Sequence, residues 1–287
     1  MTDDDRRPAG ALAPLDPICV AHLLRPLDTA LVELLRRLEP TGWEEQTLAP
    51  AWKVKDVAAH LLDTQLRKLS ICRDGSLPPG PPPSPSSLAT LVNTLNREGV
   101  TVYRRLSPAV LVALLDWAAR ESADYHESLD PFADAVFPVS WAGDDRSPNW
   151  FDTARELTER WHHQQQIRLA VGRPGIMTRE LFHPVLDCFM RALPYGYRTR
   201  DADPGTMARF DLSGDCGGSW FLYREHDGWR LIRGEAGRER SRTVVPQEIA
   251  WRMFTKGIAR EAAQAQVRVS GDRPLGLHIL DIVAIVA

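Results

Sequence analysis

The chain has 287 residues, of which 44% are hydrophobic and 25% are charged, so it is long enough for two globular domains. Its 35 Lys and Arg residues are interleaved with 38 Asp and Glu residues, and the formal net charge is -3. No basic stripe of the kind that nucleic acid binding needs is present, so we expect no nucleic acid partner.

The two ends of the chain bear on its location. The start, "MTDDDRRPAGALAP", is polar and lacks the apolar run of a secretory signal. The longest apolar run, "LHILDIVAIVA", is interrupted by Asp281 and is shorter than the roughly 20 residues that span a bilayer. We therefore expect a cytoplasmic protein with no membrane partner.

Apolar residues at three- and four-residue spacing predict long helices in the first two thirds of the chain. These helices cover residues 16–39, 54–72, 87–106 and 107–129, and a further one lies within 153–175. The proline-rich stretch 75–87 predicts a loop, because proline cannot donate a backbone hydrogen bond. Helices in this number predict a bundle.

The pattern changes after a further predicted helix at residues 177–193. Short alternating runs bounded by Gly and Asp predict antiparallel strands: "GTMARFDLSG", "GSWFLYRE", "GWRLIRG" and "AQVRVSG". Helices are predicted at residues 246–258 and 274–287. The fold class is therefore α+β with two domains. We expect a flexible N-terminus over residues 1–15, a helical bundle over 16–195 and an α+β domain over 204–287.

Two adjacent histidines, His162 and His163, lie in "TARELTERWHHQQQIRLAVGRPG". A helix turns about 100° per residue, so the two rings point in different directions. Glu159 precedes His163 by four residues, and a divalent metal held at about 2.0–2.2 Å could bind both side chains. Taken alone, however, the pair describes an ordinary ion pair, because a metal site needs a third protein ligand. We expect His162 to be a polar neighbour near Gln166.

The second predicted helix offers the third ligand. In "APAWKVKDVAAHLLDTQLRKL", His60 is flanked by Val57 and Leu61, so its polar ring is directed toward the interior of the bundle. The alternative is a core histidine that is hydrogen-bonded to Asp56 or Asp63. Two long helices with one inward histidine each favour a metal site, because bundles build such sites from facing side chains.

At these residues the sequence resembles a known family. "W-x-VKDVAAHL", followed about a hundred residues later by "E-x-x-x-H", is similar to the DinB-like metal-binding bundle in the branch of mycothiol-dependent maleylpyruvate isomerase. The resemblance implies a four-helix N-terminal domain with a divalent ion, usually zinc, on His60, Glu159 and His163. "GGSWFLYR", "GWRLIRG", "AWRMFTKG" and "VRVSGD" resemble the family's small α+β domain, which is related in shape to sterol-carrier domains.

Three protein ligands leave a coordination position open, which is typical of a catalytic zinc. Such an ion can bind a thiol as thiolate or activate water. The resemblance implies the first, with mycothiol as cosubstrate in cis–trans isomerisation of, or S-transfer to, an unsaturated organic acid or natural-product intermediate. Arg67, on the same helix face as His60, is a candidate for binding an anionic substrate or thiol carboxylate, with a solvated surface arginine as the alternative. No other catalytic residue is assigned.

Two other functions stay open. The first is a non-catalytic protein that binds an apolar ligand or lipid and has a structural metal. The aromatic residues offered for such binding are Trp220, Phe221, Tyr223, Trp229 and Trp251. The second is metal-dependent hydrolysis by activated water. The four cysteines form no CxxC pair, so neither a zinc ribbon nor a disulfide framework is expected. A monomer and a homodimer are both compatible with the sequence.

Overall fold

The computed structural model describes residues 13–76, 85–234 and 239–284, without the side chains of 85–89. Two compact units make up the chain. Within the described residues, one unit comprises 18–188 with Ala284, and the other comprises 13–17 with 189–283. Residues 1–12 of the predicted flexible N-terminus and most of the predicted proline-rich loop lie outside the described residues.

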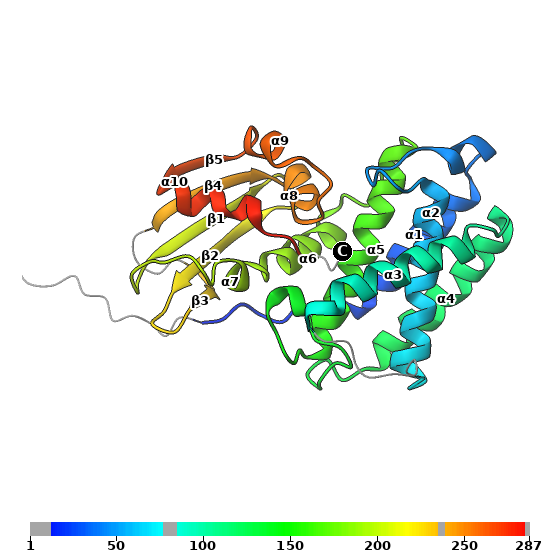
Figure 1. The fold of residues 1–287 in the computed structure, drawn as a ribbon, viewed down its shortest axis with the longest axis horizontal. Coiled ribbons are helices and arrows are strands. Elements are labelled where there is room, and N and C mark those ends of the chain that lie inside the picture. Colours follow the sequence, from blue (N-terminus) through cyan, green and yellow to red (C-terminus); the bar gives the residue numbers. More distant parts are fainter. Residues whose placement is uncertain (1–12, 77–84, 235–238, 285–287) are drawn as a thin grey trace, which may run out of the picture. The chain divides into compact units, whose positions relative to one another are not determined.

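The first unit is helical (Figure 1). Its long helices are α1 (Ala21–Arg36), α2 (Val54–Lys68), α3 (Pro85–Tyr103), α4 (Pro108–Ser128) and α5 (Asn149–Ala170). Its short helical turns are η1 (Pro40–Glu44), η2 (Leu69–Arg73) and η3 (Ser140–Ala142). Helix α6 (Arg179–Met190) follows α5 and extends into the second unit.

The core of the bundle lies between α1, α2, α4 and α5. Helix α1 packs against α4 and α5, whereas α2 packs against α3, α4 and α5. Apolar side chains at helical spacing fill the interior, among them Leu31, Leu35, Val57, Leu61 and Leu115. Helix α5 is central, because most of its residues are buried, including polar ones. Polar side chains in such a place need partners, and this requirement builds the site described below.

The second unit is a five-stranded sheet with short helices. Its strands are β1 (Met207–Ser213), β2 (Gly218–Arg224), β3 (Trp229–Ile232), β4 (Glu239–Pro246) and β5 (Arg268–Gly271), in the spatial order β3-β2-β1-β4-β5 (Figure 1). Its helices are α7 (Leu193–Gly196), α8 (Gln247–Phe254), α9 (Arg260–Gln264), α10 (Arg273–Leu277) and the 3-10 turn η4 (His278–Asp281). Helices α8 and α10 pack against β4 and β1.

Strand β4 is absent from the sequence prediction. It pairs with β1 in parallel, whereas the pairs β1–β2, β2–β3 and β4–β5 are antiparallel as expected. The buried positions of β4 are Ser241, Thr243 and Val245, so the alternation of apolar and polar residues that marks a strand is weak. Gly276 of α10 lies close to this strand, since a Cβ there would be 2.6 Å from Thr243 Oγ1. Small side chains thus let helix and strand approach.

The predicted closing helix, 274–287, is wrong in its extent. The chain forms α10 and η4 and then becomes extended at Ile282, where φ is -95° and ψ is 129°. The β-branched pair Ile282 and Val283 favours extended backbone, which ends the helical run. Residues 285–287 lie outside the described part.

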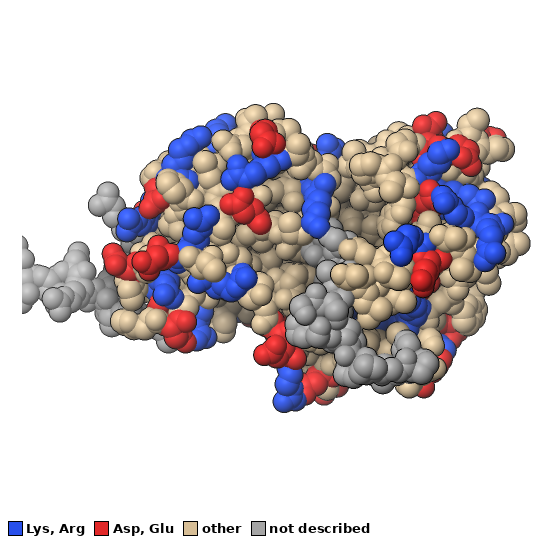
Figure 2. Space-filling view, viewed as in Figure 1, with Lys and Arg blue, Asp and Glu red and all other residues tan. Residues whose placement is uncertain are grey.

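In the view of Figure 2, basic and acidic side chains are interspersed over each unit. Among the helices that the structure describes, none combines the length and the apolar character needed to cross a bilayer.

Candidate metal centre

Helix α2 places His60 inside the bundle. Its first turn is fixed by Asp56, whose carboxylate accepts a hydrogen bond from the backbone N–H of Lys53 at 3.1 Å. Val57 and Leu61 are buried in the bundle core, and His60 between them is 3% exposed. The ring therefore lies in the interior, as the sequence pattern suggested.

Helix α5 carries the facing groups. Its polar residues at spacings of three and four share one face of the helix: Asp152, Glu156, Glu159 and His163. This face meets α2, since Lys68 contacts Asp152 near one end and His60 contacts His163 near the other. The two helices thus form a buried polar seam, with the histidines at one end.

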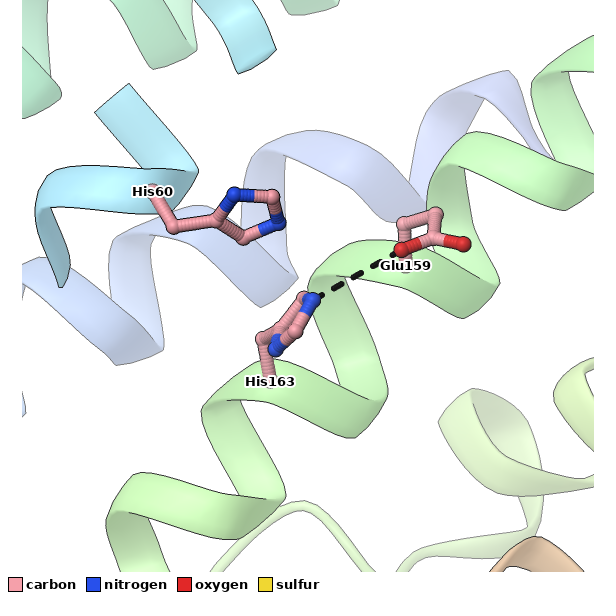
Figure 3. A group of neighbouring side chains, drawn as sticks. All are labelled: His60, Glu159 and His163. Carbon is pink, nitrogen blue, oxygen red and sulfur yellow. Dashed lines mark ion pairs between the residues drawn. The ribbon is translucent and has the colours of Figure 1, made fainter. Parts of the chain in front are cut away.

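His60, Glu159 and His163 point toward one another (Figure 3). Each offers one ligand atom, and these atoms lie within 4.8 Å of one another. His163 Nε2 is 3.6 Å from Glu159 Oε2, and the rings of His60 and His163 are 4.6 Å apart with an interplanar angle of 71°. Two ligands of a tetrahedral ion at ~2.1 Å are roughly 3.4 Å apart, so small side-chain rotations would let all three share a cation.

The protonation states suit metal binding. Burial lowers the pKa of His163 to about 3 and holds the pKa of His60 well below its ordinary value. Both imidazoles are therefore neutral at pH 7, the form in which histidine binds metals. His163 Nδ1 lies 3.0 Å from the amide Oε1 of Gln166, which can only accept, so Nδ1 carries the proton and the bare Nε2 faces Glu159.

Two further observations show that a divalent cation fits these residues. Figure 3 shows the ring nitrogen of His60 that is farther from the backbone directed toward Glu159 and His163, the placement that a shared cation requires. Burial also raises the pKa of Glu159, although its side chain is 30% exposed, and a cation would favour the ionised carboxylate. The partial exposure of Glu159 leaves the group reachable from solvent.

His162 is not part of this group. Its Nδ1 lies 3.0 Å from the backbone oxygen of Thr158, one turn earlier, and burial lowers its pKa to about 4. Gln166, which was expected beside His162, instead accepts from His163. The ring of His162 packs 3.9 Å from that of His163, so it supports the second histidine from the side.

Arg67, on the same helix as His60, is held by two hydrogen bonds. Its Nε donates to Asp63 Oδ2 at 2.8 Å, and its Nη2 donates to Asn96 Oδ1 of α3 at 2.8 Å. Gly99 makes room for this arrangement, since a Cβ there would lie 2.2 Å from the Asp63 carboxyl carbon. The guanidinium is thus held in place, and its side chain is 26% exposed.

The seam also contains a charge network that the sequence reading missed. Lys68 Nζ is 2.6 Å from Asp152 Oδ2 and 3.3 Å from Glu156 Oε1, and Arg155 Nη2 is 3.0 Å from Glu156 Oε1. Burial raises the pKa of both carboxyls, but the two basic groups outweigh it and hold each pKa below its ordinary value. The sequence does contain one indication of this network, because Asp152 lies on the same helix face as Glu159 and His163.

His126 of α4 provides a test of this buried seam. It is 2% exposed, and burial lowers its pKa to about 3, whereas an unfolded histidine titrates near 6.5. Between these values only the unfolded state binds the proton, so stability falls as the pH is lowered below about 6.5. Replacing His126 with Gln should reduce the slope of unfolding free energy against pH by about 1.4 kcal/mol per unit. Denaturant titrations between pH 6.5 and 4.5 measure this slope. An unchanged slope in the variant would show that buried His126 does not contribute to the pH dependence of stability.

Four of the five aromatic residues that the sequence offered for ligand binding are buried in the α+β unit, and the fifth, Tyr223, is partly buried against a small apolar cluster. Trp220, Trp229 and Trp251 are each 5% exposed or less, and Phe221 is 8% exposed. Their burial within the sheet unit accounts for them without a bound ligand.

Together, the fold and the site define a two-domain α+β protein with a candidate His/Glu/His metal centre in its helical bundle. Residues 24–168 match the family model of the mycothiol maleylpyruvate isomerase N-terminal domain, and the chain belongs to this family. The predicted family is therefore confirmed.

Two solved structures share the fold. One is the crystal structure of a histidine-to-alanine mutant of the mycothiol-dependent maleylpyruvate isomerase, with 12% identity, a TM-score of 0.51, and coverage of 87% of this chain and 91% of that chain. The other is the crystal structure of the mycothiol-dependent maleylpyruvate isomerase, with 12% identity, a TM-score of 0.50, and coverage of 81% and 86%. They confirm the α+β two-domain fold class. A search of curated proteins gave no match.

Proposed function

We propose that the chain is a metal-dependent enzyme that uses a low-molecular-weight thiol, mycothiol, to isomerise or S-conjugate a small unsaturated organic acid. The observation that carries the proposal is the convergence of His60, Glu159 and His163 in a chain of this family. We assign these three residues as ligands of one divalent ion, with zinc as the ion that suits two imidazoles and a carboxylate.

When bound, the ion supplies positive charge that lowers the pKa of a thiol from about 8.5 and favours the thiolate. The protein supplies the orientation. Gln166 holds the His163 ring with Nε2 toward the site, and the buried walls exclude water around both imidazoles. Access is on the side of Glu159, the most exposed of the three groups.

The proposed reaction has one first step, addition of the thiol, and two possible products. The thiolate sulfur adds to the activated double bond, a C–S bond forms, and the π electrons move onto the substrate's carbonyl. Rotation about the resulting single bond, followed by cleavage of the C–S bond, returns the thiol and the trans isomer. If the carbon next to the carbonyl instead takes up a proton, the S-conjugate is the product.

Arg67 is proposed to bind a carboxylate of the substrate or thiol. Replacing Arg67 with Met should raise KM about tenfold or more and change kcat less, because a charge-assisted hydrogen bond contributes about 1.5–3 kcal/mol. Asp63→Asn is the matched control, since it removes the carboxylate partner of Arg67 but keeps the guanidinium. Steady-state kinetics of both variants measure the changes in KM and kcat. A normal KM in Arg67→Met would remove this residue from the substrate site.

The function is tested by incubating the zinc-loaded protein with mycothiol and maleylpyruvate. We expect conversion that requires both zinc and thiol, either to the trans isomer without thiol consumption or to an S-conjugate with stoichiometric consumption. Zinc-dependent cleavage of the substrate by water, with no thiol required, would instead identify a hydrolase. Unchanged thiol together with tight binding of an apolar ligand would identify a binding protein.

A further inference from the structure

The two histidines of the candidate centre are held in different ways. His163 is oriented by the hydrogen bond from its Nδ1 to Gln166 Oε1. His60 has no equivalent, because its Nδ1 is buried without a hydrogen-bond partner among the described residues. Histidines that bind metals ordinarily rely on such a bond to fix the ring, so another contact must orient His60.

That contact is the indole of Trp52. Its ring centroid lies 4.7 Å from that of His60, with an interplanar angle of 38°, and 6.0 Å from that of His163. His163 itself packs edge-on against His60 at 4.6 Å. The His60 ring is therefore in contact with an aromatic ring and with its fellow candidate ligand, a packing that restricts rotation about its side-chain bonds.

Trp52 is itself fixed before helix α2 begins. Its carbonyl oxygen accepts hydrogen bonds from Thr47 Oγ1 at 2.7 Å and from Gln46 Nε2 at 2.9 Å, and its N–H donates to Ala49 O at 2.9 Å. The indole is partly buried and packs against the bundle core. A backbone anchored at both its N–H and its carbonyl gives the indole a defined place.

We propose that Trp52 is a positioning residue that orients His60 for metal binding, in the role that Gln166 has for His163. The inference rests on the proposed function, because it requires His60 to be a metal ligand. It assigns the Trp of the motif "W-x-VKDVAAHL" a role toward the metal rather than only toward the core.

The test is the affinity of the purified apo-protein for Zn2+, measured by competition with a chromophoric chelator. Trp52→Ala should weaken zinc binding by about 10–100-fold, the range found when groups that orient metal ligands are removed. Trp52→Phe keeps an aromatic face, so its zinc affinity should stay within about threefold of that of the wild type. Trp117→Ala, at a 44% exposed tryptophan of α4, should leave the affinity unchanged.

A second readout separates orientation from stability. At saturating Co2+, the visible spectrum of Trp52→Ala should differ from that of the wild type, because the spectrum reports the geometry of the ligands, whereas a purely structural role would leave it unchanged. If Trp52→Ala does not fold, Trp52→Leu keeps apolar volume without the ring and should show the same loss.

Equal zinc affinity and equal cobalt spectra in the folded Trp52→Ala variant would overturn the inference and leave the metal site intact. An equal loss in Trp52→Phe and Trp52→Ala would also overturn it, because the aromatic face would then not be the cause. If the wild type itself binds no zinc, the proposed function fails first, and the inference fails with it.

Discussion

Replacing His163 or His60 with alanine is expected to reduce thiol-dependent turnover by about a thousandfold or more. A bound ion stabilises developing charge by several kcal/mol, and about 4 kcal/mol corresponds to a thousandfold in rate. His163 is also the residue that contacts both other members of the group, since its ring lies 4.6 Å from that of His60 and its Nε2 lies 3.6 Å from Glu159. Initial rates at saturating thiol and zinc measure the effect.

His162→Ala is the matched control for this prediction. It removes an adjacent buried histidine of the same helix, whose Nδ1 is engaged by Thr158 O rather than directed into the group of three. Its turnover should stay within about tenfold of the wild type, a change of roughly 1.4 kcal/mol in activation free energy. A larger loss in His162→Ala than in His163→Ala would show that the wrong histidine has been assigned.

Replacing Lys68 with Met is expected to destabilise the protein by about 3–5 kcal/mol, because it leaves buried carboxylates without a compensating charge. Lys68 is 7% exposed, and its Nζ contacts both Asp152 and Glu156. Met has a similar length and apolar character, so the packing of the side-chain stem is kept. Equilibrium unfolding in urea at pH 7 gives the difference directly.

The ion pair between Lys53 and Glu44 is the control for Lys68. It has a comparable N–O distance of 2.8 Å but lies on the surface, where both side chains are at least 50% exposed. Lys53→Met should leave the unfolding midpoint unchanged, because solvent screens such a pair. If Lys68→Met also leaves the unfolding midpoint unchanged, Arg155 alone compensates both carboxylates and Lys68 is not needed for stability.

Much of the fold followed from periodicity. The apolar spacing of α1, α2, α4 and α5 predicted the bundle, because each of these helices buries a stripe against its neighbours. The helical face shared by Glu159 and His163 could likewise be computed from their separation of four residues. That His60 meets them is a contact between distant segments, and periodicity cannot supply it. The family resemblance indicated it before the structure showed the three groups together.

What could not be predicted depends on partners in three dimensions. Strand β4 was missed because its buried residues include Ser241 and Thr243, whose hydroxyls hide the apolar alternation. The buried position of Lys68 gave no sequence signal, since a lysine on a helix is ordinarily solvated. The link between His163 and Gln166 was missed for a related reason, because the direction of a polar side chain depends on its surroundings and not on spacing alone.

The most direct test of the central claim is the metal content of the purified protein and of its single variants, measured by inductively coupled plasma mass spectrometry after equal zinc loading and desalting. The account predicts one divalent ion per chain in the wild type and in His162→Ala. It predicts little or none in His60→Ala, Glu159→Ala and His163→Ala, with all variants folded. Metal retained by His60→Ala and His163→Ala, or lost from His162→Ala alone, would contradict the assignment of the site.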